Sequence, residues 1–216
     1  MSHTNIGVKM KRLIFPLAIC ALALAMTTAT LAQNDDRNKV EVFAGYSLLH
    51  TDAGDLDSSF NSHGVKGAVT GSLSRYFGLT GDISYNSKSG SFSDSSGVYN
   101  GKFRTTQFMG GVQIKNYNKD GGKLRPFATA LAGVANQHAD INGTVFGSPF
   151  NGSVGSTDFA MALGGGLDLK VSDRLDIRLV QAEYNPIFVK DQTVNGTTFS
   201  GGTQNNFRLS FGIVIH

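Results

Sequence analysis

The sequence has few of the residues on which many exported proteins and enzymes depend: among 216 residues there are one cysteine, no tryptophan and four prolines, and only 16% are charged. Low charge together with 27 glycines excludes a helix-rich or coiled-coil protein, whose composition is the opposite. A single cysteine cannot form an intrachain disulfide, so another interaction must hold the fold together. The length is ample for one domain with a buried core or a closed barrel.

A targeting segment precedes the folded domain. Basic residues at positions 9 to 12 are followed by an apolar run over residues 13–26 and then by a stretch of small residues. This order is typical of a secretory signal peptide, and the apolar run is shorter than the roughly 20 residues of a membrane-spanning helix. We predict that residues 1–32 are a cleaved signal peptide and residues 33–216 the mature domain, with cleavage after Ala29 as the alternative.

The predicted mature chain is electrically neutral. Removing residues 1–32 takes three of the 19 basic residues and none of the 16 acidic ones, which leaves 16 of each. The only cysteine, Cys20, is removed as well. Nucleic-acid binding needs a basic surface, so this balance argues against a nucleic-acid partner.

The mature sequence alternates between apolar and polar residues with the period of two that a half-buried strand requires. The last strand shows the alternation best, and its apolar residues occupy the odd positions from Phe207 to Ile215. The pattern predicts eight strands, most of them long enough to cross a bilayer at a tilt. They cover residues 40–49, 64–76, 79–86, 103–115, 124–136, 158–171, 175–185 and 206 onward.

One strand changes phase partway along. It begins with Leu175, Ile177 and Leu179 on the apolar face, but Val180 and Gln181 exchange faces. An extra residue in one strand of a pair has this effect, so the sequence predicts a β-bulge near Val180.

The connections between strands alternate in length. Tight turns are predicted at residues 77–78 and 172–174 and a short connection at 116–123, whereas the connections at 50–63, 87–102, 137–157 and 186–205 are long. Short turns at one end and long loops at the other are typical of outer-membrane barrels. Asn-Gly pairs in the long connections are hairpin signals, so several strands are predicted to run beyond the membrane and turn there. These pairs begin at Asn100, Asn142, Asn151 and Asn195.

The charged residues decide which face of the barrel is inside. In a soluble ligand-binding barrel the apolar face points inward and the charges face water, which is the alternative here. Charges of both signs in mid-strand positions can instead pair in a narrow lumen, while the apolar face contacts lipid. We therefore predict an all-β, eight-stranded antiparallel up-and-down transmembrane β-barrel. Its predicted interior charge network consists of Glu41, Asp82, Lys115, Asp168, Asp176, Arg178 and Arg208.

Three segments resemble the OmpA/OmpX-type family of small outer-membrane barrels: RYFGL at 75–79, LRPF at 124–127 followed by LAG at 131–133, and the terminal strand from Phe207. The resemblance covers the mature chain and implies a bacterial outer-membrane protein that contacts lipid and lipopolysaccharide. It also implies that the barrel-assembly machinery reads the last strand, and we expect a monomer. The residues of that assembly signal would be Phe207, Leu209, Phe211, Ile213 and Ile215.

Two features depart from this family. Such barrels end on a lipid-facing aromatic residue, whereas His216 falls on the inward face. Either an aromatic residue follows this sequence or insertion relies on a weaker signal. Because tryptophan is absent, tyrosine and phenylalanine must form the aromatic girdles at the membrane interfaces. The candidates are Tyr46, Tyr85, Tyr117, Phe127, Tyr184 and Phe207.

No motif points to catalysis or to a cofactor. The glycines at 164–166 lie inside a strand with no helix after it, which excludes a phosphate-binding loop. No histidine stands in the His-x-Ser pairing of barrel hydrolases, so we predict no enzyme. The first long loop lacks the calcium-loop spacing, so we interpret it as a solvated loop without a metal ion. Its potential ligands are His50, Asp52, Asp55, Asp57 and His63.

The predicted function is a structural and surface-interacting one. Eight strands enclose a lumen that side chains just fill, and four long loops meet the outside in adhesion-like contacts. The alternative is a narrow pore or a transporter of small or hydrophobic solutes. Glycine and alanine in 124–136 and 158–171 leave room for such a path.

Overall fold

The computed structural model describes residues 38–52, 59–94, 97–120, 122–194, 197–199 and 201–216. The predicted signal peptide lies outside these residues. Within them no helix is long and apolar enough to span a membrane. The long strands are β1 (Val40–Thr51), β2 (Phe60–Ser72), β3 (Phe77–Asp94), β4 (Gly97–Lys115), β5 (Leu124–Val145), β6 (Ser148–Lys170), β7 (Leu175–Tyr184) and β12 (Asn206–Ile215). Between the last two lie β8 (Ile187–Val189), β9 (Gln192–Val194), β10 (Thr197–Phe199) and β11 (Gly202–Gln204).

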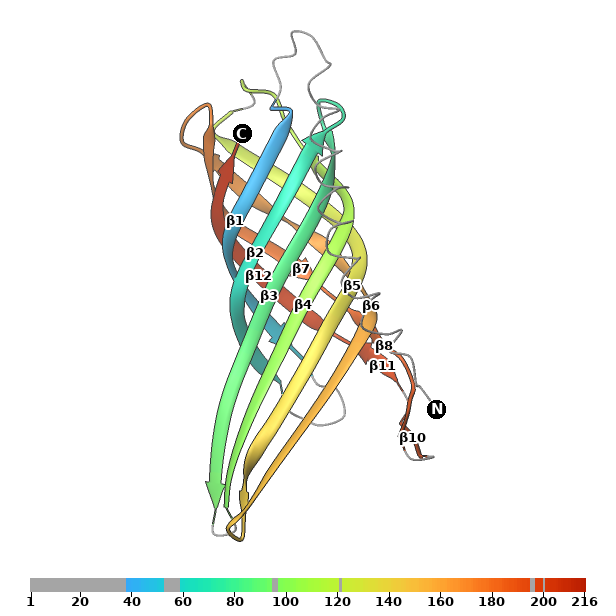
Figure 1. The fold of residues 1–216 in the computed structure, drawn as a ribbon. Coiled ribbons are helices and arrows are strands. Elements are labelled where there is room, and N and C mark those ends of the chain that lie inside the picture. The colour runs from blue at the N-terminus through green and yellow to red at the C-terminus, as the bar shows by residue number, and fades with distance from the viewer. Residues whose placement is uncertain (1–37, 53–58, 95–96, 121, 195–196, 200) are drawn as a thin grey trace, which may run out of the picture.

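The eight long strands close into a barrel. Strands β1 to β7 pair antiparallel in sequence order, and β12 closes the ring between β7 and β1. Following paired residues once round the ring from Val40 leads back to β1 at His50, ten residues further along. Such a stagger requires strands tilted from the barrel axis, and Figure 1 shows this tilt. The predicted eight-stranded up-and-down antiparallel barrel is confirmed.

The two faces of the barrel differ in polarity as predicted. Large apolar side chains point outward and are about half exposed, such as Leu79 at 54% and Ile213 at 45%. Charged side chains point inward, where Asp168 and Arg208 have no exposed surface. An outer wall of this composition needs lipid to cover it. The alternative of a soluble barrel with its charges in water is therefore wrong.

The predicted bulge in β7 is confirmed. Asp168 of β6 pairs with Arg178, but the preceding residue, Leu167, pairs with Val180. Leu179 and Val180 consequently both lie on the outer face, at 46% and 44% exposure. The bulge moves the odd-numbered residues that follow it into the barrel interior.

The short turns lie at one end of the barrel, together with the start of β1 and the end of β12. Between β2 and β3 the amide of Leu73 donates to the carbonyl of Phe77 at 2.8 Å, so the turn spans residues 73–76. The predicted turn at 77–78 is wrong, because both residues belong to β3. Gly78 faces the interior, where a Cβ atom would lie 2.5 Å from the hydroxyl of Tyr117, so its small size serves packing.

Strands β3 to β6 extend far beyond the others at the opposite end, where they form the long projection of Figure 1. The pairing of β2 with β3 stops at Ser87, and beyond it residues 88–94 pair only with β4. The predicted long loops at 87–102 and 137–157 are thus mostly hairpin strands. We call residues 88–102 and 139–154 the extension.

The Asn-Gly pairs do not make the turns of these hairpins. Asn100, Asn142 and Asn151 are cross-strand partners within the ladder. The β5–β6 turn is formed by Phe146 and Gly147, whose φ angles are 47° and 79°. Both angles are positive, as a tight hairpin turn requires, and the register brings Val145 opposite Ser148. The fourth predicted pair, at Asn195, lies outside the described residues.

The closure of β1 on β12 depends on two paired glycines, Gly45 and Gly212. We expect Gly212→Val to destabilise the barrel by about 2–3 kcal/mol, because its Cβ would lie 2.3 Å from the carbonyl oxygen of Ala44. The temperature at which the folded gel band converts to the unfolded one should fall. Gly71→Val is the control, since nothing lies within 4 Å of a Cβ there. Equal effects of the two substitutions would contradict this account of the closure.

Candidate functional site

The barrel interior holds all seven residues predicted for the charge network, each buried to at least 93%. Together with four further residues they form two layers. The layer near the short turns is called the periplasmic layer below, because short turns face the periplasm in outer-membrane-type barrels. It consists of Glu41, Lys115, Arg125, Asp168, Asp176, Arg178 and His216. The central layer consists of Lys66, Asp82, Glu183 and Arg208.

Lys115 joins the carboxylates of the periplasmic layer. Its Nζ lies 2.8 Å from Glu41 Oε1 and 2.8 Å from Asp168 Oδ2, and 3.8 Å from Asp176. These partners come from β1, β6 and β7, so one ammonium group ties together strands from different sides of the ring. A lysine has three donors and no acceptor, which suits a position among several carboxylates.

Arg178 fills the cross-section of the same layer. Its guanidinium donates to both oxygens of Asp168, at 2.8 and 3.1 Å. The Cζ atom also lies over two aromatic rings, 4.4 Å from the centroid of Phe43 and 4.1 Å from that of Phe127. Bidentate pairing combined with two cation–π contacts fixes this side chain inside the barrel.

The periplasmic mouth is closed by groups near the chain's turns. His216 places one ring nitrogen 3.3 Å from Glu41 and the other 3.1 Å from Asp176, and Arg125 lies 3.3 Å from Asp176. The hydroxyl of Tyr117, in the β4–β5 turn, contacts Gln113. Burial, together with the charge of Glu41, raises the pKa of Tyr117, so this hydroxyl remains protonated.

The central layer has the same design. Lys66 Nζ lies 2.6 Å from Glu183 and 3.2 Å from Asp82. Arg208 donates to Ser84 and Asn185 at 2.9 Å each and also to Gln107. The two layers are linked through Gln181, whose amide oxygen accepts from Arg178 while its nitrogen donates to Glu183.

Opposite charges balance within each layer. The periplasmic layer holds three carboxylates against three strong bases and His216, and the central layer holds two against two. Pairing compensates for the loss of hydration that burial imposes on each ion. The interior is therefore a stack of neutral polar layers that occupies the lumen.

Three strong contributors were missed by the sequence reasoning. Lys66 alternates with the outward-facing Val65, so the sequence pattern does indicate that its side chain points into the barrel. Arg125 lies in an alanine-rich strand whose phase the alternation leaves ambiguous. Glu183 follows the β7 bulge, so only the shifted phase after Val180 places it inside.

Two residues predicted for the aromatic girdles are inside the barrel instead. Tyr117 has no exposed surface and Phe127 only 6%. The Phe127 ring contacts the guanidinium of Arg178, and the Tyr117 hydroxyl contacts Gln113. The other four predicted aromatics face outward. The outward aromatics toward the extension include Tyr46, Tyr85, Phe108, Phe159, Tyr184, Phe188, Phe207 and Phe211, and those near the short turns include Tyr76 and Phe77.

The last strand presents its predicted assembly residues to the outside. Phe207, Phe211, Ile213 and Ile215 are 45–53% exposed, and Leu209 is partly buried in the same row. His216 is the next residue and turns inward into the periplasmic layer.

The first loop contributes no metal site within the described residues. His50 bonds to Asn61 at 2.7 Å, and His63 bonds to the hydroxyl of Tyr46. In the described part of the chain no three histidine, cysteine or acidic side chains gather as ligands would. Of the other potential ligands, Asp52 is exposed at the end of the described β1 segment, and Asp55 and Asp57 lie outside the described residues.

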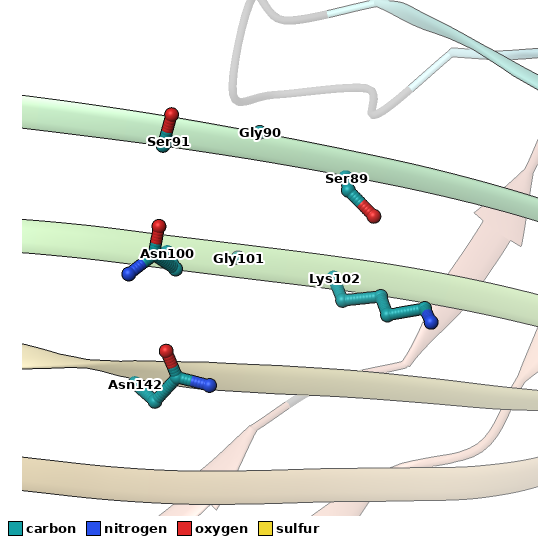
Figure 2. A pocket seen from close by; sticks show the side chains of 7 residues that line it. All are labelled: Ser89, Gly90, Ser91, Asn100, Gly101, Lys102 and Asn142. Atoms are coloured by element: carbon teal, nitrogen blue, oxygen red, sulfur yellow. The ribbon is translucent and has the colours of Figure 1, made fainter.

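The extension has one polar face, which continues the outer wall of the barrel. A shallow hollow of about 350 Å³ lies on this face. Figure 2 labels its lining residues, among which the cross-strand partners Gly90 and Gly101 lie in the middle. Hydroxyl, amide and ammonium groups surround the two glycines. They belong to Ser89, Ser91, Asn100, Lys102 and Asn142.

Replacing Arg208 by leucine tests the central layer. The change removes three hydrogen bonds and leaves two carboxylates with one ammonium, so we expect a loss of about 3–5 kcal/mol. Heating in detergent followed by gel electrophoresis measures it as a lower conversion temperature. Arg174→Leu, in an exposed periplasmic turn, should leave that temperature unchanged. Unchanged heat resistance of the Arg208→Leu variant would refute the structural role of this layer.

Comparison with known proteins agrees with this architecture. The family model described as outer membrane protein beta-barrel domain matches residues 18–213. Comparison with curated protein sequences finds no match.

Solved outer-membrane barrels share the fold. Ail, the attachment invasion locus protein of Yersinia pestis, aligns with a TM-score of 0.52 at 15% identity, over 82% of this chain and 97% of Ail. The outer membrane protease OmpT from Escherichia coli aligns with a TM-score of 0.52 at 9% identity, over 86% of this chain and 99% of OmpT. Identities this low concern the fold alone.

The lipid-facing wall, the neutral interior layers and the family match lead to one conclusion: this chain belongs to the outer membrane protein beta-barrel domain family and is located in the bacterial outer membrane.

Proposed function

We propose that the protein is a structural outer-membrane barrel whose extension mediates adhesion-like contacts at the cell surface. The observation that carries the proposal is the length of β3 to β6. These four strands have 18 to 23 residues, whereas about 9 to 11 suffice to cross the membrane at a tilt. The surplus is an ordered, four-stranded sheet outside the bilayer.

Several properties of the extension support a binding role. Its polar face carries the hollow of Figure 2, which is rich in hydrogen-bonding groups. Its opposite face and tip expose apolar side chains to water, including Ile141, Phe146 and Val154 at 53–84% exposure. Exposed apolar surface outside the membrane is characteristic of interaction sites.

The predicted alternative, a narrow pore or a solute transporter, has a weaker basis. Apolar patches do occur inside the barrel beside the small residues of β5 and β6, such as the contact of Met109 on β4 with Leu131 and Ala162. The charge layers, however, span the same lumen, and a conducting path would have to bypass Arg178 and Arg208. We therefore favour a closed barrel.

The remaining partners follow from the position in the membrane. We propose that the outer wall contacts lipid and lipopolysaccharide, that the outward residues of β12 act as the assembly signal, and that the barrel is monomeric. We propose no enzymatic activity, because the likeness to a protease is one of fold and no nucleophile and base pair was found in the sequence.

Shortening the extension tests the proposed role directly. Residues 91–100 and 142–151 are replaced by Asn-Gly turns, which join the paired residues Gly90 with Gly101 and Ile141 with Gly152. We expect unchanged heat resistance in detergent but loss of attachment when non-adherent bacteria display the variant. Attachment is counted on glass coated with matrix proteins or with heparin. Heparin is a rational first surface because Ail has been solved with the heparin analogue sucrose octasulfate, at 13% identity to this chain and a TM-score of 0.51. Full attachment by the shortened variant would overturn the proposal.

Conductance separates the closed barrel from the pore. Residues 33–216, refolded into a planar bilayer and verified as inserted by the heat-dependent gel shift, should produce no stable single-channel current. Stable current in the intact protein would make transport the better hypothesis. The selectivity of that current should then change on neutralising Asp82.

A further inference from the structure

The inward face of the extension contains a second hollow, separate from the polar one of Figure 2. Its volume is about 270 Å³. It lies at the edge of the barrel wall, at the level where β2 begins with Phe60 and where β3 to β5 continue beyond β2. Its lining is mostly apolar. The residues that define it are Phe60, Lys88, Gly90, Gly101, Phe103 and Ile141.

The shape of this hollow arises from two pairs of residues. The rings of Phe60 and Phe103 meet edge to face with centroids 5.3 Å apart and form one wall. Gly90 and Gly101 are cross-strand partners, and a Cβ on either would meet no atom within 4 Å. The missing side chains therefore leave open space beside the aromatic wall. Ile141 borders this space with 53% of its surface exposed.

Polar side chains follow the hollow on its barrel side. Gln137 on β5, four residues from Ile141, donates to Gln204 of β11 at 2.6 Å. Asp158 on β6 is 97% buried and accepts from the amide of Lys190. The apolar lining therefore belongs to the extension and gives way to polar groups toward the barrel interior.

Two lysines, Lys88 and Lys102, border the hollow. Lys102 alternates with Phe103 and also lines the polar hollow of the outer face, so Lys88 is the ammonium on the apolar face. Lys88 is the cross-strand partner of Phe103 and is exposed. Asp140, whose backbone borders the hollow, pairs with Arg104. Among the described residues no carboxylate lies within ion-pairing distance of Lys88. An apolar cleft with one unpaired ammonium complements a ligand that is apolar at one end and anionic at the other.

We propose that this hollow binds a small apolar carboxylate. The aromatic or hydrocarbon part lies against Phe103 and Ile141 over the two glycines, and the carboxylate pairs with Lys88 Nζ. The volume is slightly below the roughly 300–1,000 Å³ of sites for drug-sized ligands, so the ligand is of the size of a phenyl-substituted short fatty acid. This hollow shares the apolar face of the extension with the exposed side chains that support the adhesion-like role, so the shortened variant is needed to test the two proposals separately.

The test uses 4-phenylbutyrate as the probe and the mature protein in phosphatidylcholine nanodiscs. In one NMR titration, the methyl chemical shifts of the isoleucines report where the ligand binds. We expect saturable shifts for Ile141, in the hollow, and none for Ile213, which faces lipid. Shifts of both methyls that grow without saturation would mean partition into the bilayer and would overturn the proposal.

Matched variants locate the site on one face of one strand. Ile141→Asp should weaken binding at least about tenfold, because it puts a charge into the apolar contact. Asn142→Asp adds the same charge to the polar face one residue away and should leave the affinity within about twofold. Because the Ile141→Asp variant lacks the isoleucine methyl group, binding to both variants is followed by the chemical shifts of the ring protons of Phe103. Equal loss in both variants would overturn the assignment to the inward face.

Charge reversal tests the role of the lysine. Lys88→Glu should abolish saturable binding of 4-phenylbutyrate and create binding of 4-phenylbutylamine, which differs only in the sign of its charged end. Retained phenylbutyrate binding would show that the ammonium is not its partner. The shortened extension described above keeps Gly90, Gly101 and Ile141, so it can lose attachment and still bind the probe, which distinguishes the two proposals.

Discussion

The ion pairs of Lys115 with Glu41 and Asp168 are the constraint on which the rest of the barrel depends. The outer wall must be apolar because it faces lipid, so every second residue of each strand must point into a narrow lumen. Ionised groups are costly to bury unless each has an opposite partner and its remaining hydrogen bonds. One ammonium at 2.8 Å from two carboxylates meets this need and also joins strands that are not neighbours in the sheet.

The same constraint explains the order of the interior. Arg178 pairs with Asp168 and is covered by two rings, and Gln181 passes hydrogen bonds from it to Glu183 in the central layer. Rigid, neutral layers of this kind stabilise the barrel and occupy its bore. Interaction with the surroundings is then left to the parts outside the bilayer, which is why we propose the extension as the functional part.

The extension is a sheet with two chemically different faces. In the barrel, the inward phase is polar and the outward phase apolar; in the extension the assignment reverses. Ser89, Asn100 and Asn142 occupy the outward phase, while Phe103 and Ile141 occupy the inward one. The reversal follows the change of solvent, since the outer face of the extension no longer meets lipid. The apolar inward face has no lumen to fill, and it is this unpaired surface that forms the second hollow.

Alternation alone was enough to predict the eight long strands, the inward and outward faces of most of them, and the bulge at Val180, since each of these is a property of neighbouring residues. The faces of the alanine-rich β5 stayed open, because alanine suits either side. Turn positions were less predictable. Asn-Gly pairs are turn formers, but register places Asn100, Asn142 and Asn151 opposite one another inside the ladder, and the turn falls at Phe146 and Gly147. Aromatic residues were also ambiguous, because a ring suits either the membrane interface or the interior, where Phe127 contacts Arg178 and Tyr117 contacts Gln113.

The sequence by itself therefore determined the barrel, its orientation toward lipid and most of its buried charges, because the period of two and the sign of each residue are local properties. Only the tertiary structure decided which charges pair, how far the hairpins extend and where the two hollows lie. Those features depend on the stagger of strands around the closed ring, which brings together residues such as Lys66 and Glu183 that are 117 positions apart in the chain.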